Sequence, residues 1–567
     1  MRDSGIPQAV RDIDLPEPAT FQPYWPQPSA DNSSRSETVV ENRPVPERLA
    51  LASQGIPGFG GHLDGRLSGA RRQPGPLKQR WTISDFVEAY TKGLTTPAEV
   101  AERIIALIWE QDSCAPPMRM MLAHLPHHLR QHAAASTERY KQGRPLSCLD
   151  GVPYTVIDGI DALPYPTTAG TTFMHKLRPA TGDAPCIQRL SESGALLVGK
   201  SNLHEIGVGM TGLNMRHGTT RNPYDPRCYT GGSSSGSAAA VSSGLCVFAL
   251  GIDGGGSVRV PSALCGVVGL RPTVGRTSTQ HCPENAFSIM SFGTHTVCAA
   301  DAMLVYSVIA NAGMELATPR PALLRVPSQL YDDTPAAAEM VMPLKGRRVG
   351  VYRQLFEDAS PDVVRACQHA VDLLKEHGCE VVPMCVPELE LVRVAQILTI
   401  SSELCQAYKF AAANSSLRKQ FNLETRVSLA AAAQFTATDY LQAQKIRTRL
   451  MRHYRRIFFE QGIDYVATPT TGTTAPVIRE EALIVGEADL RQTGELMRFT
   501  ISANMAGIPA ITVPVGQCSR GLPIGLQLMG KPWEEASLLY VTSVLESAVK
   551  PLLKMPAVSY DLLSSQC

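Results

Sequence analysis

The chain has 567 residues, of which 44% are hydrophobic and 19% are charged. These shares are typical of a folded globular protein, and they exclude a wholly disordered chain and a coiled coil. Lys and Arg number 53 against 52 Asp and Glu, so the net charge is only +1. Such a balance produces no net positive electrostatic field that would attract a polyanion, and we therefore expect no nucleic-acid partner.

The fourteen cysteines are scattered without a C-x-x-C pair, which argues against zinc ribbons and thioredoxin motifs. No stretch reaches the roughly 18 apolar residues that a membrane-spanning helix needs, and the first residues lack the apolar run of a signal peptide. We expect a cytoplasmic protein with reduced thiols. Peripheral contact with an internal membrane stays open because it needs only a surface patch, and a homodimer stays open as well.

The chain begins with a proline-rich segment. Residues 1–80 hold eleven of the 42 prolines, mixed with Gly, Ser and charged residues. We predict an irregular N-terminal extension over residues 1–80, lying on or beside the core, and one large domain over residues 81–567. Within that domain, Thr96, Pro97 and Glu99 form a capping-box pattern with proline at the first helical position, which predicts a helix start.

Strand and helix patterns then alternate. Residues 152–157 form an apolar run typical of a buried strand, residues 187–193 are typical of a helix, and residues 195–198 of another strand. The same order returns as a strand over 348–352, a helix from Ser360 to Gly378 and a strand over 379–382. Such βαβ units predict an α/β fold in which a partly parallel sheet is covered by helices on both faces.

The most unusual feature is a pair of Gly/Ser loops. Residues 231–237 contain Ser233 and Ser234, and residues 253–257 contain three glycines before Ser257. A short helix over 237–244 and a strand over 246–252 lie between them, so each loop sits at the end of an element. Glycines leave backbone N–H groups unobstructed, which suits an anion-binding concavity beside a nucleophilic hydroxyl.

Three other interpretations of these loops are weaker. Flexible linkers of similar composition rarely run directly into packed apolar sequence such as residues 264–269. A nucleophile elbow with Ser234 at its centre requires a strand immediately before it, whereas residues 222–227 are typical of a turn. A phosphate-binding loop requires a Gly-Lys-Ser/Thr sequence that follows neither glycine run.

The two loops and their flanks resemble the amidase signature family. Within that family, residues 219–223 and 229–239 are similar to the plant-type fatty acid amide hydrolases. The resemblance runs from about Trp81 to the end of the chain. The other segments that carry it are Gly151-Val152-Pro153 and residues 166–170, 266–273, 467–478 and 521–530.

This resemblance implies a large mixed β-sheet sandwiched between helical layers and a serine hydrolase mechanism without cofactor or metal. Ser257 matches the acylated nucleophile, and Ser233 matches a bridging serine on a cis peptide bond that relays the proton. A neutral lysine is the final base in that mechanism. The N–H groups of Gly254, Gly255, Gly256 and Ser257 match the oxyanion hole, with Ser234 close by.

The sequence departs from the family at two places. Ile157 stands where the family carries its base lysine, and an aliphatic side chain cannot accept a proton. Lys176 and Lys200 are the nearest lysines downstream, and neither is an obvious substitute. Thr294 and His295 stand where the family usually has proline and a hydrophobic residue, so this segment is expected to be less rigid.

Three further groups of residues are expected to be structural rather than catalytic or ligand-binding. His124, His127, His128 and His132 lack a Cys or carboxylate partner, and we expect a surface helix interrupted by Pro126, with no metal site. His204 and Glu205 are adjacent residues that seldom converge with a third group, so we do not expect a triad with Ser257. The basic residues 445–456 fit the solvated face of an amphipathic helix whose inner face carries Ile446, Leu450 and Ile457.

The sequence thus predicts an amide hydrolase that acts on a small-molecule acyl amide, such as an N-acylethanolamine, through an acyl-serine intermediate. Ile157 suggests that its activity is impaired. Two alternatives stay open: a catalytically inactive protein that binds a ligand or acts as a scaffold, and one component of a multi-chain amidotransferase.

Overall fold

A computed structural model describes most of the chain. The described residues are 8–11, 13, 15–25, 37–40, 43–54, 56, 80–283, 286–311, 324–327, 342–549 and 553–564. Much of the proline-rich segment, residues 57–79 above all, lies outside the described residues.

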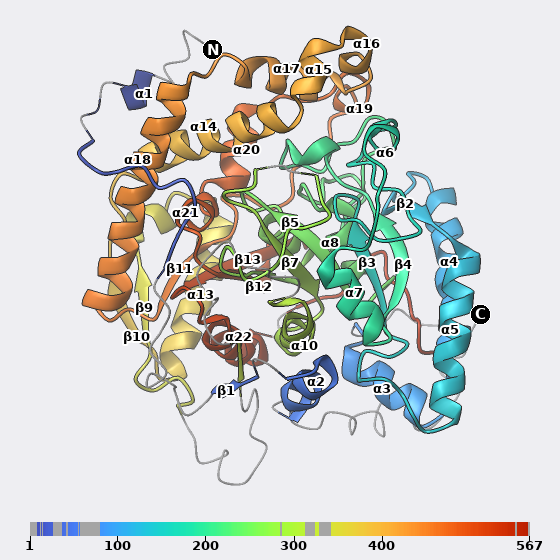
Figure 1. Ribbon diagram of the computed structural model, residues 1–567. Helices are drawn as coiled ribbons and strands as arrows, with labels where there is room; N and C mark the ends of the chain where they lie inside the picture. The colour runs from blue at the N-terminus through green and yellow to red at the C-terminus, as the bar shows by residue number, and fades with distance from the viewer. Residues whose placement is uncertain are drawn as a thin grey trace.

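An eleven-stranded sheet forms the centre of the molecule (Figure 1). Its strand order is β10-β9-β11-β13-β12-β6-β7-β5-β3-β4-β2. The strands are β2 (Met121–His124), β3 (Pro153–Ile157), β4 (Leu196–Ser201), β5 (Phe248–Asp253), β6 (Val268–Arg271), β7 (Ser291–Thr296), β9 (Arg348–Val351), β10 (Glu380–Pro383), β11 (Tyr465–Pro469), β12 (Ala510–Gln517) and β13 (Pro523–Gly530).

The sheet is mixed. Strand β3 runs parallel to β4 and β5, and β9 runs parallel to β10 and β11, while β5, β7, β6, β12, β13 and β11 pair antiparallel in turn. These two parallel groups correspond to the two βαβ patterns in the sequence. The prediction of an α/β fold with a large mixed sheet between helical layers is confirmed.

Helices cover both faces of the sheet. A Cβ atom added to Gly525 of β13 would meet Ala263 on one face, whereas one added to Gly530 would meet Leu538. Because successive side chains alternate between faces, these two positions place α9 (Arg259–Cys265) and α22 (Glu535–Val549) on opposite faces. Helix α8 (Ser235–Ser243) packs beside α9, and α10 (Ala299–Ile309) packs beside α22.

The remaining helices flank this core (Figure 1). They are α1 (Gln8–Arg11), α2 (Val45–Gln54), α3 (Ile83–Thr91), α4 (Pro97–Ser113), α5 (Pro126–Lys141), α6 (Met174–Leu177), α7 (Pro185–Glu192), α12 (Arg353–Phe356), α13 (Pro361–Glu376), α14 (Leu389–Ala407), α15 (Lys409–Ala413), α16 (Ser415–Arg418), α17 (Leu423–Ala432), α18 (Ala437–Arg455), α19 (Ala482–Val485), α20 (Leu490–Met497) and α21 (Ile501–Ala506).

A local sequence signal correctly places the start of α4. Thr96 caps α4 through the N–H of Glu99, and the Glu99 carboxylate accepts the N–H of Thr96, as the capping-box pattern predicted. Pro126, by contrast, does not interrupt a helix. It occupies the first turn of α5, where its missing N–H would have no helical partner anyway, and His124 lies outside this helix on β2.

The described parts of residues 1–80 pack on the main body and are more regular than expected. Helix α1 lies against α14 and α18, β1 (Glu37–Val39) pairs with β8 (Arg325–Pro327), and α2 packs on α10. Whether residue 80 is a domain boundary stays a prediction. Within the part of the chain that the structure describes, no helix is long and apolar enough to cross a membrane.

Candidate active site

The two Gly/Ser loops come together at one end of the sheet. Ser233 precedes α8, and Ser257 lies between β5 and α9. The N–H of Ser234 donates to the carbonyl oxygen of Ser257 at 3.3 Å, which joins the loops directly. Ser233 and Ser257 are 4% and 6% exposed, so both hydroxyls are largely withdrawn from water.

The backbone around Ser233 has the conformation that the family resemblance implied. The peptide bond between Gly232 and Ser233 is cis, and both residues belong to the described core. The carbonyl oxygen of Ser233 accepts the N–H of His204 at 3.0 Å. The hydroxyl of Ser257 has a neighbour in Met210, whose sulfur lies 3.8 Å from its Oγ.

Asp253, at the end of β5, anchors the loop that carries Ser257. Its carboxylate accepts the N–H groups of Gly256 at 2.9 Å and Val258 at 3.1 Å, and it also binds Arg259 and Asn504. Burial alone would raise the pKa of this carboxyl, but Arg259 and the other donors hold it well below its usual range. The ionised carboxylate therefore fixes the course of the loop.

The backbone N–H groups next to Ser257 differ in their availability. The N–H of Gly256 is committed to Asp253, which corrects the expectation that this group belongs to an open anion hole. Those of Gly254, Gly255 and Ser257 have no acceptor among the described residues. Gly256 has a φ of +115°, and a Cβ there would clash with Thr500 Oγ1, so the turn requires glycine.

Ile157 lies on the face of the sheet that α8 covers. It is paired with Ser201 in the register of β3 and β4, and residues paired in this way project from the same face. The hydroxyl of Ser201 lies 2.7 Å from that of Ser237 on α8. The side chain at position 157 is therefore on the α8 side of the sheet, fully buried and apolar.

Lys200 projects from the face of the sheet opposite to Ile157, so it does not supply a base at that position. It is paired with Val156, and its ammonium group contacts the carbonyl oxygen of Ile160, Thr167 Oγ1 at 3.0 Å and Asp158 at 3.6 Å. Burial lowers its pKa, while Asp158 opposes that effect. Lys176, the other lysine considered, is exposed on α6.

His295 lies on β7, which is next to β5 on the side away from β3. Its Nε2 atom and Ser234 Oγ lie 2.6 Å and 2.9 Å from the position that a Cβ on Gly251 would occupy. Val156 pairs with Leu250, so Ile157 and Gly251 are neighbours on the same face. Residues 157 and 295, the two positions that the resemblance singled out, thus meet at Gly251.

His295 is nevertheless a poor base. Burial lowers the pKa of its imidazole to about 3, so a proton on it is strongly disfavoured near neutral pH. Its Nδ1 atom lies 2.8 Å from Ser262 Oγ, and its Nε2 has no hydrogen-bond partner among the described residues.

A family model described as "Amidase" matches residues 106–539. The chain belongs to the amidase signature family. A fatty acid amide hydrolase from Oryza sativa subsp. indica is 40% identical over 566 residues, which cover 99% of this chain and 90% of that protein. A fatty acid amide hydrolase from Arabidopsis thaliana is 40% identical over 570 residues, covering 100% and 91% of the two chains.

More distant relatives of this amidase-family chain share less of its length. A glutamyl-tRNA(Gln) amidotransferase component from Chloroflexus aggregans is 33% identical over 485 residues, covering 81% of this chain and 94% of that protein. The solved structure of native peptide amidase from Stenotrophomonas maltophilia matches with a TM-score of 0.69 and 27% identity, covering 84% and 98% of the chains. The prediction of an amide hydrolase of this family is thus confirmed. The two alternatives, an inactive binding or scaffold protein and an amidotransferase component, are not favoured.

The other residues that the sequence singled out have structural partners in this amidase-family chain. His204 lies 3.3 Å from Glu424, and Glu205 accepts the N–H of Asn422 at 2.8 Å, so the two side chains are directed to the region of α17. No group of His, Cys, Asp and Glu that could hold a metal ion occurs among the residues that the structure describes.

The basic face of α18 is covered in part, while Arg452 and Arg455 are exposed as expected. Ile446, Leu450 and Ile457 are buried as expected. Arg447 is also fully buried and donates to the carbonyl oxygen of Phe21 at 2.6 Å, while Arg449 pairs with Glu17 at 3.0 Å. No local pattern signals this cover, because the covering residues lie in the N-terminal segment more than 400 positions away.

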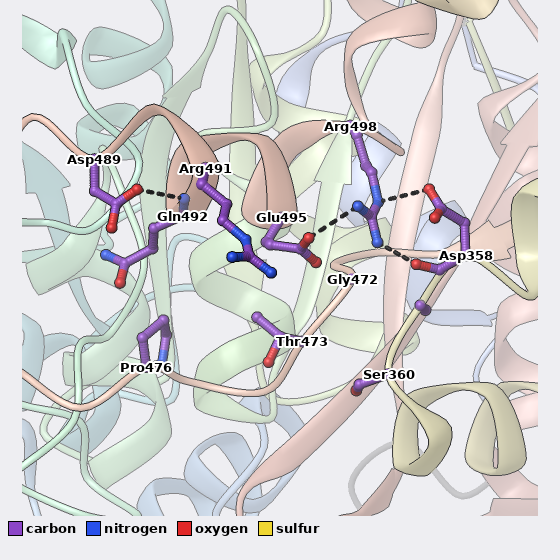
Figure 2. A pocket seen from close by; sticks show the side chains of 11 residues that line it. Asp358, Ser360, Gly472, Thr473, Pro476, Asp489, Arg491, Gln492, Glu495 and Arg498 are labelled. Atoms are coloured by element: carbon purple, nitrogen blue, oxygen red, sulfur yellow. Dashed lines mark hydrogen bonds and ion pairs between the residues drawn. The ribbon is translucent and has the colours of Figure 1, made fainter.

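A polar pocket of about 530 Å³ is lined by residues of α20 and of the segments around Ser360 and Gly472 (Figure 2). Arg498 at its edge donates to Glu495 at 3.0 Å and pairs with Asp358 at 3.2 Å. Figure 2 shows these side chains gathered beside the end of α20. Met497, on the same helix, instead reaches the Ser257 loop, where its Cε lies 3.2 Å from the Cβ position of Gly255.

Proposed function

We propose that this protein hydrolyses neutral amides of long-chain acyl groups through an acyl intermediate on Ser257. The observation that carries the proposal is the contact between the Ser233 and Ser257 loops, beside three backbone N–H groups that have no acceptor in the part of the chain that the structure describes. The 40% identity to plant proteins named fatty acid amide hydrolase, over nearly the whole chain, supports a fatty acid amide as the substrate.

In the proposed acylation step, Ser257 Oγ forms a bond to the substrate carbonyl carbon as its O–H bond breaks. The proton passes to Ser233 and then to the leaving amine, whose C–N bond breaks. The N–H groups of Gly254, Gly255 and Ser257 stabilise the negative charge that develops on the carbonyl oxygen. Water then hydrolyses the ester on Ser257, which releases the fatty acid and restores the hydroxyl.

We further propose that this reaction is slow in the natural protein, because Ile157 provides no base for the proton of Ser233. A positioned base typically contributes a factor of roughly 10² to 10⁴ to the rate. The backbone donors and the two serines still provide the part of catalysis that does not depend on the base.

The direct test is turnover of N-hexadecanoyl ethanolamine, followed as release of the free fatty acid. We expect slow release that disappears in Ser257→Ala. The matched control is Ser242→Ala, which changes a buried serine of α8 that donates to Cys265 rather than lining the loops, and it should retain the release. Release that survives in Ser257→Ala, or no release at all from the natural protein, would contradict the proposal.

We also propose that the protein is cytoplasmic and meets its apolar substrate at the surface of an internal membrane. Five apolar residues on α17, α19 and α20 are largely exposed: Leu423, Val427, Ile484, Val485 and Leu490. Gly486 lies next to Glu424, which brings the end of α19 beside the start of α17. Exposed apolar side chains at neighbouring helix ends support peripheral binding, and Ile484→Glu should weaken co-sedimentation with lipid vesicles.

A further inference from the structure

Gln396, on α14, is a fully buried glutamine. It is 0% exposed, and neither its Nε2 nor its Oε1 has a partner among the described residues. Leaving both a donor and an acceptor unpaired in the interior is costly, and such groups in native proteins call for an explanation.

The amide of Gln396 lies against the segment that contains Gly254 and Gly255. Its Nε2 lies 3.1 Å from the position that a Cβ on Gly255 would occupy. Ile400, one helical turn further along α14, lies 3.7 Å from the corresponding position on Gly254. The same face of α14 therefore covers both glycines and brings one carboxamide to them.

The other atoms that approach these two glycines are uncharged. Ala286 and Met290 meet the Cβ position of Gly254, and Met497 meets that of Gly255. Met497 is only partly buried, and its unbranched thioether side chain is adaptable enough to move aside for a ligand. The surroundings thus suit a neutral group rather than a carboxylate or an ammonium ion.

We propose that Gln396 binds the hydroxyl group of the amine portion of the substrate, so that N-hydroxyalkyl amides are preferred over N-alkyl amides. A hydroxyl both donates and accepts, so it can satisfy Oε1 and Nε2 of one carboxamide. This inference rests on the proposed function, since it needs the scissile amide to lie at the Ser257 loop.

The test measures equilibrium binding to Ser257→Ala protein, which cannot consume the ligand through Ser257. The two ligands are N-(2-hydroxyethyl)hexadecanamide and N-propylhexadecanamide, which have nearly the same shape. We expect the hydroxyethyl ligand to bind more tightly by about tenfold. In Gln396→Met this preference should vanish, while the affinity for the propyl ligand stays the same.

Gln444→Met is the matched control. Gln444 is also a buried glutamine, but it lies on α18, where its Nε2 donates to Thr399 Oγ1 at 3.0 Å. This variant should keep the ligand preference and unfold at a lower temperature, because it loses a native hydrogen bond. Gln396→Met should not unfold earlier, because it removes only unpaired polar atoms.

Two results would overturn the inference while leaving the proposed function intact: a preference that persists in Gln396→Met, or an equal loss of affinity for both ligands, which indicates a merely structural side chain. If the Ser257→Ala protein binds neither ligand, the proposed function itself is contradicted, and the role of Gln396 is contradicted with it.

Discussion

Ile157 lies on the sheet face covered by α8, the helix that follows Ser233, and its side chain has no atom that can accept a proton. A lysine in its place would project from that same face. Its burial would favour the neutral amine that a base requires, as burial already lowers the pKa of Lys200 nearby.

We therefore expect Ile157→Lys to raise amide turnover by a factor of roughly 10² to 10⁴, measured as kcat/KM for N-hexadecanoyl ethanolamine. Ile157→Met is the control, since the methionine side chain is nearly as long as that of lysine but has no basic nitrogen. An equal gain in both variants, or no gain in either, would refute the assignment of position 157 to the proton path.

His295 makes the stability of the folded protein sensitive to acid. Its pKa is about 3 in the folded protein, against about 6.5 for an unperturbed histidine. Between these values the unfolded chain binds more protons than the folded one, so stability falls as the pH falls below about 6.5. The slope due to this residue is about 1.4 kcal/mol for each pH unit within that window.

His295→Met removes this contribution and restores a hydrophobic residue at the position. The midpoint of thermal unfolding of the natural protein should drop further between pH 7.0 and 5.0 than that of the variant. A parallel drop in both proteins would show that His295 is not held neutral by burial.

At the scale of elements, the turn between β5 and α9 depends on one carboxylate. Asp253 is fully buried, and Arg259 beside it is fully buried as well. Replacing one partner of such a pair leaves the other charge uncompensated, at a cost of roughly 3 to 5 kcal/mol.

Asp253→Asn should therefore lower the melting temperature markedly, as followed by circular dichroism. It should also abolish the reaction of Ser257 with a fluorophosphonate, as followed by mass spectrometry. Glu102→Gln breaks an exposed pair with Arg130 and should leave both measurements almost unchanged. A stable Asp253→Asn protein would mean that the loop is held by other contacts.

At the scale of the whole molecule, the N-terminal segment is bound to the helices that cover the site. Trp25 is 4% exposed and donates to the carbonyl oxygen of Ala506 on α21 at 2.8 Å. Val10 and Leu15 belong to the same apolar cluster as residues of α14 and α18. This packing makes the segment part of the folded body.

Trp25→Ala should destabilise the protein by roughly 3 to 5 kcal/mol, the usual cost of removing a large buried aromatic side chain. Its neighbour Tyr24 is 56% exposed, and Tyr24→Ala should have little effect on the same thermal melt. Equal melting temperatures for the two variants would show that the segment does not stabilise the fold.

Much of this architecture could be predicted from local patterns. The capping box at Thr96, the alternation of strands and helices, and the two Gly/Ser loops are short-range signals, and each is where the sequence placed it. Asn504 and Gln396 could not be found in this way. Asn504 reaches Asp253 from 251 residues further along the chain, and nothing near either residue marks it as part of the site.

The commitment of the Gly256 N–H to Asp253 and the burial of Arg447 escaped prediction for a related reason. Sequence spacing indicates which groups are close along the chain, but not which distant group forms a hydrogen bond with them after folding. The assignment of a base lysine to position 157 rests on the family resemblance and stays a prediction, while the strand register shows that Lys200 projects from the other face.

The central claim is that Ser257 is a nucleophile beside its backbone donors. The measurement that tests it most directly is reaction of the natural protein with a fluorophosphonate, with the modified residue identified by mass spectrometry. We predict slow modification confined to Ser257, absent in Ser257→Ala and faster in Ile157→Lys. Modification at another residue, or none at Ser257 even in Ile157→Lys, would contradict the account.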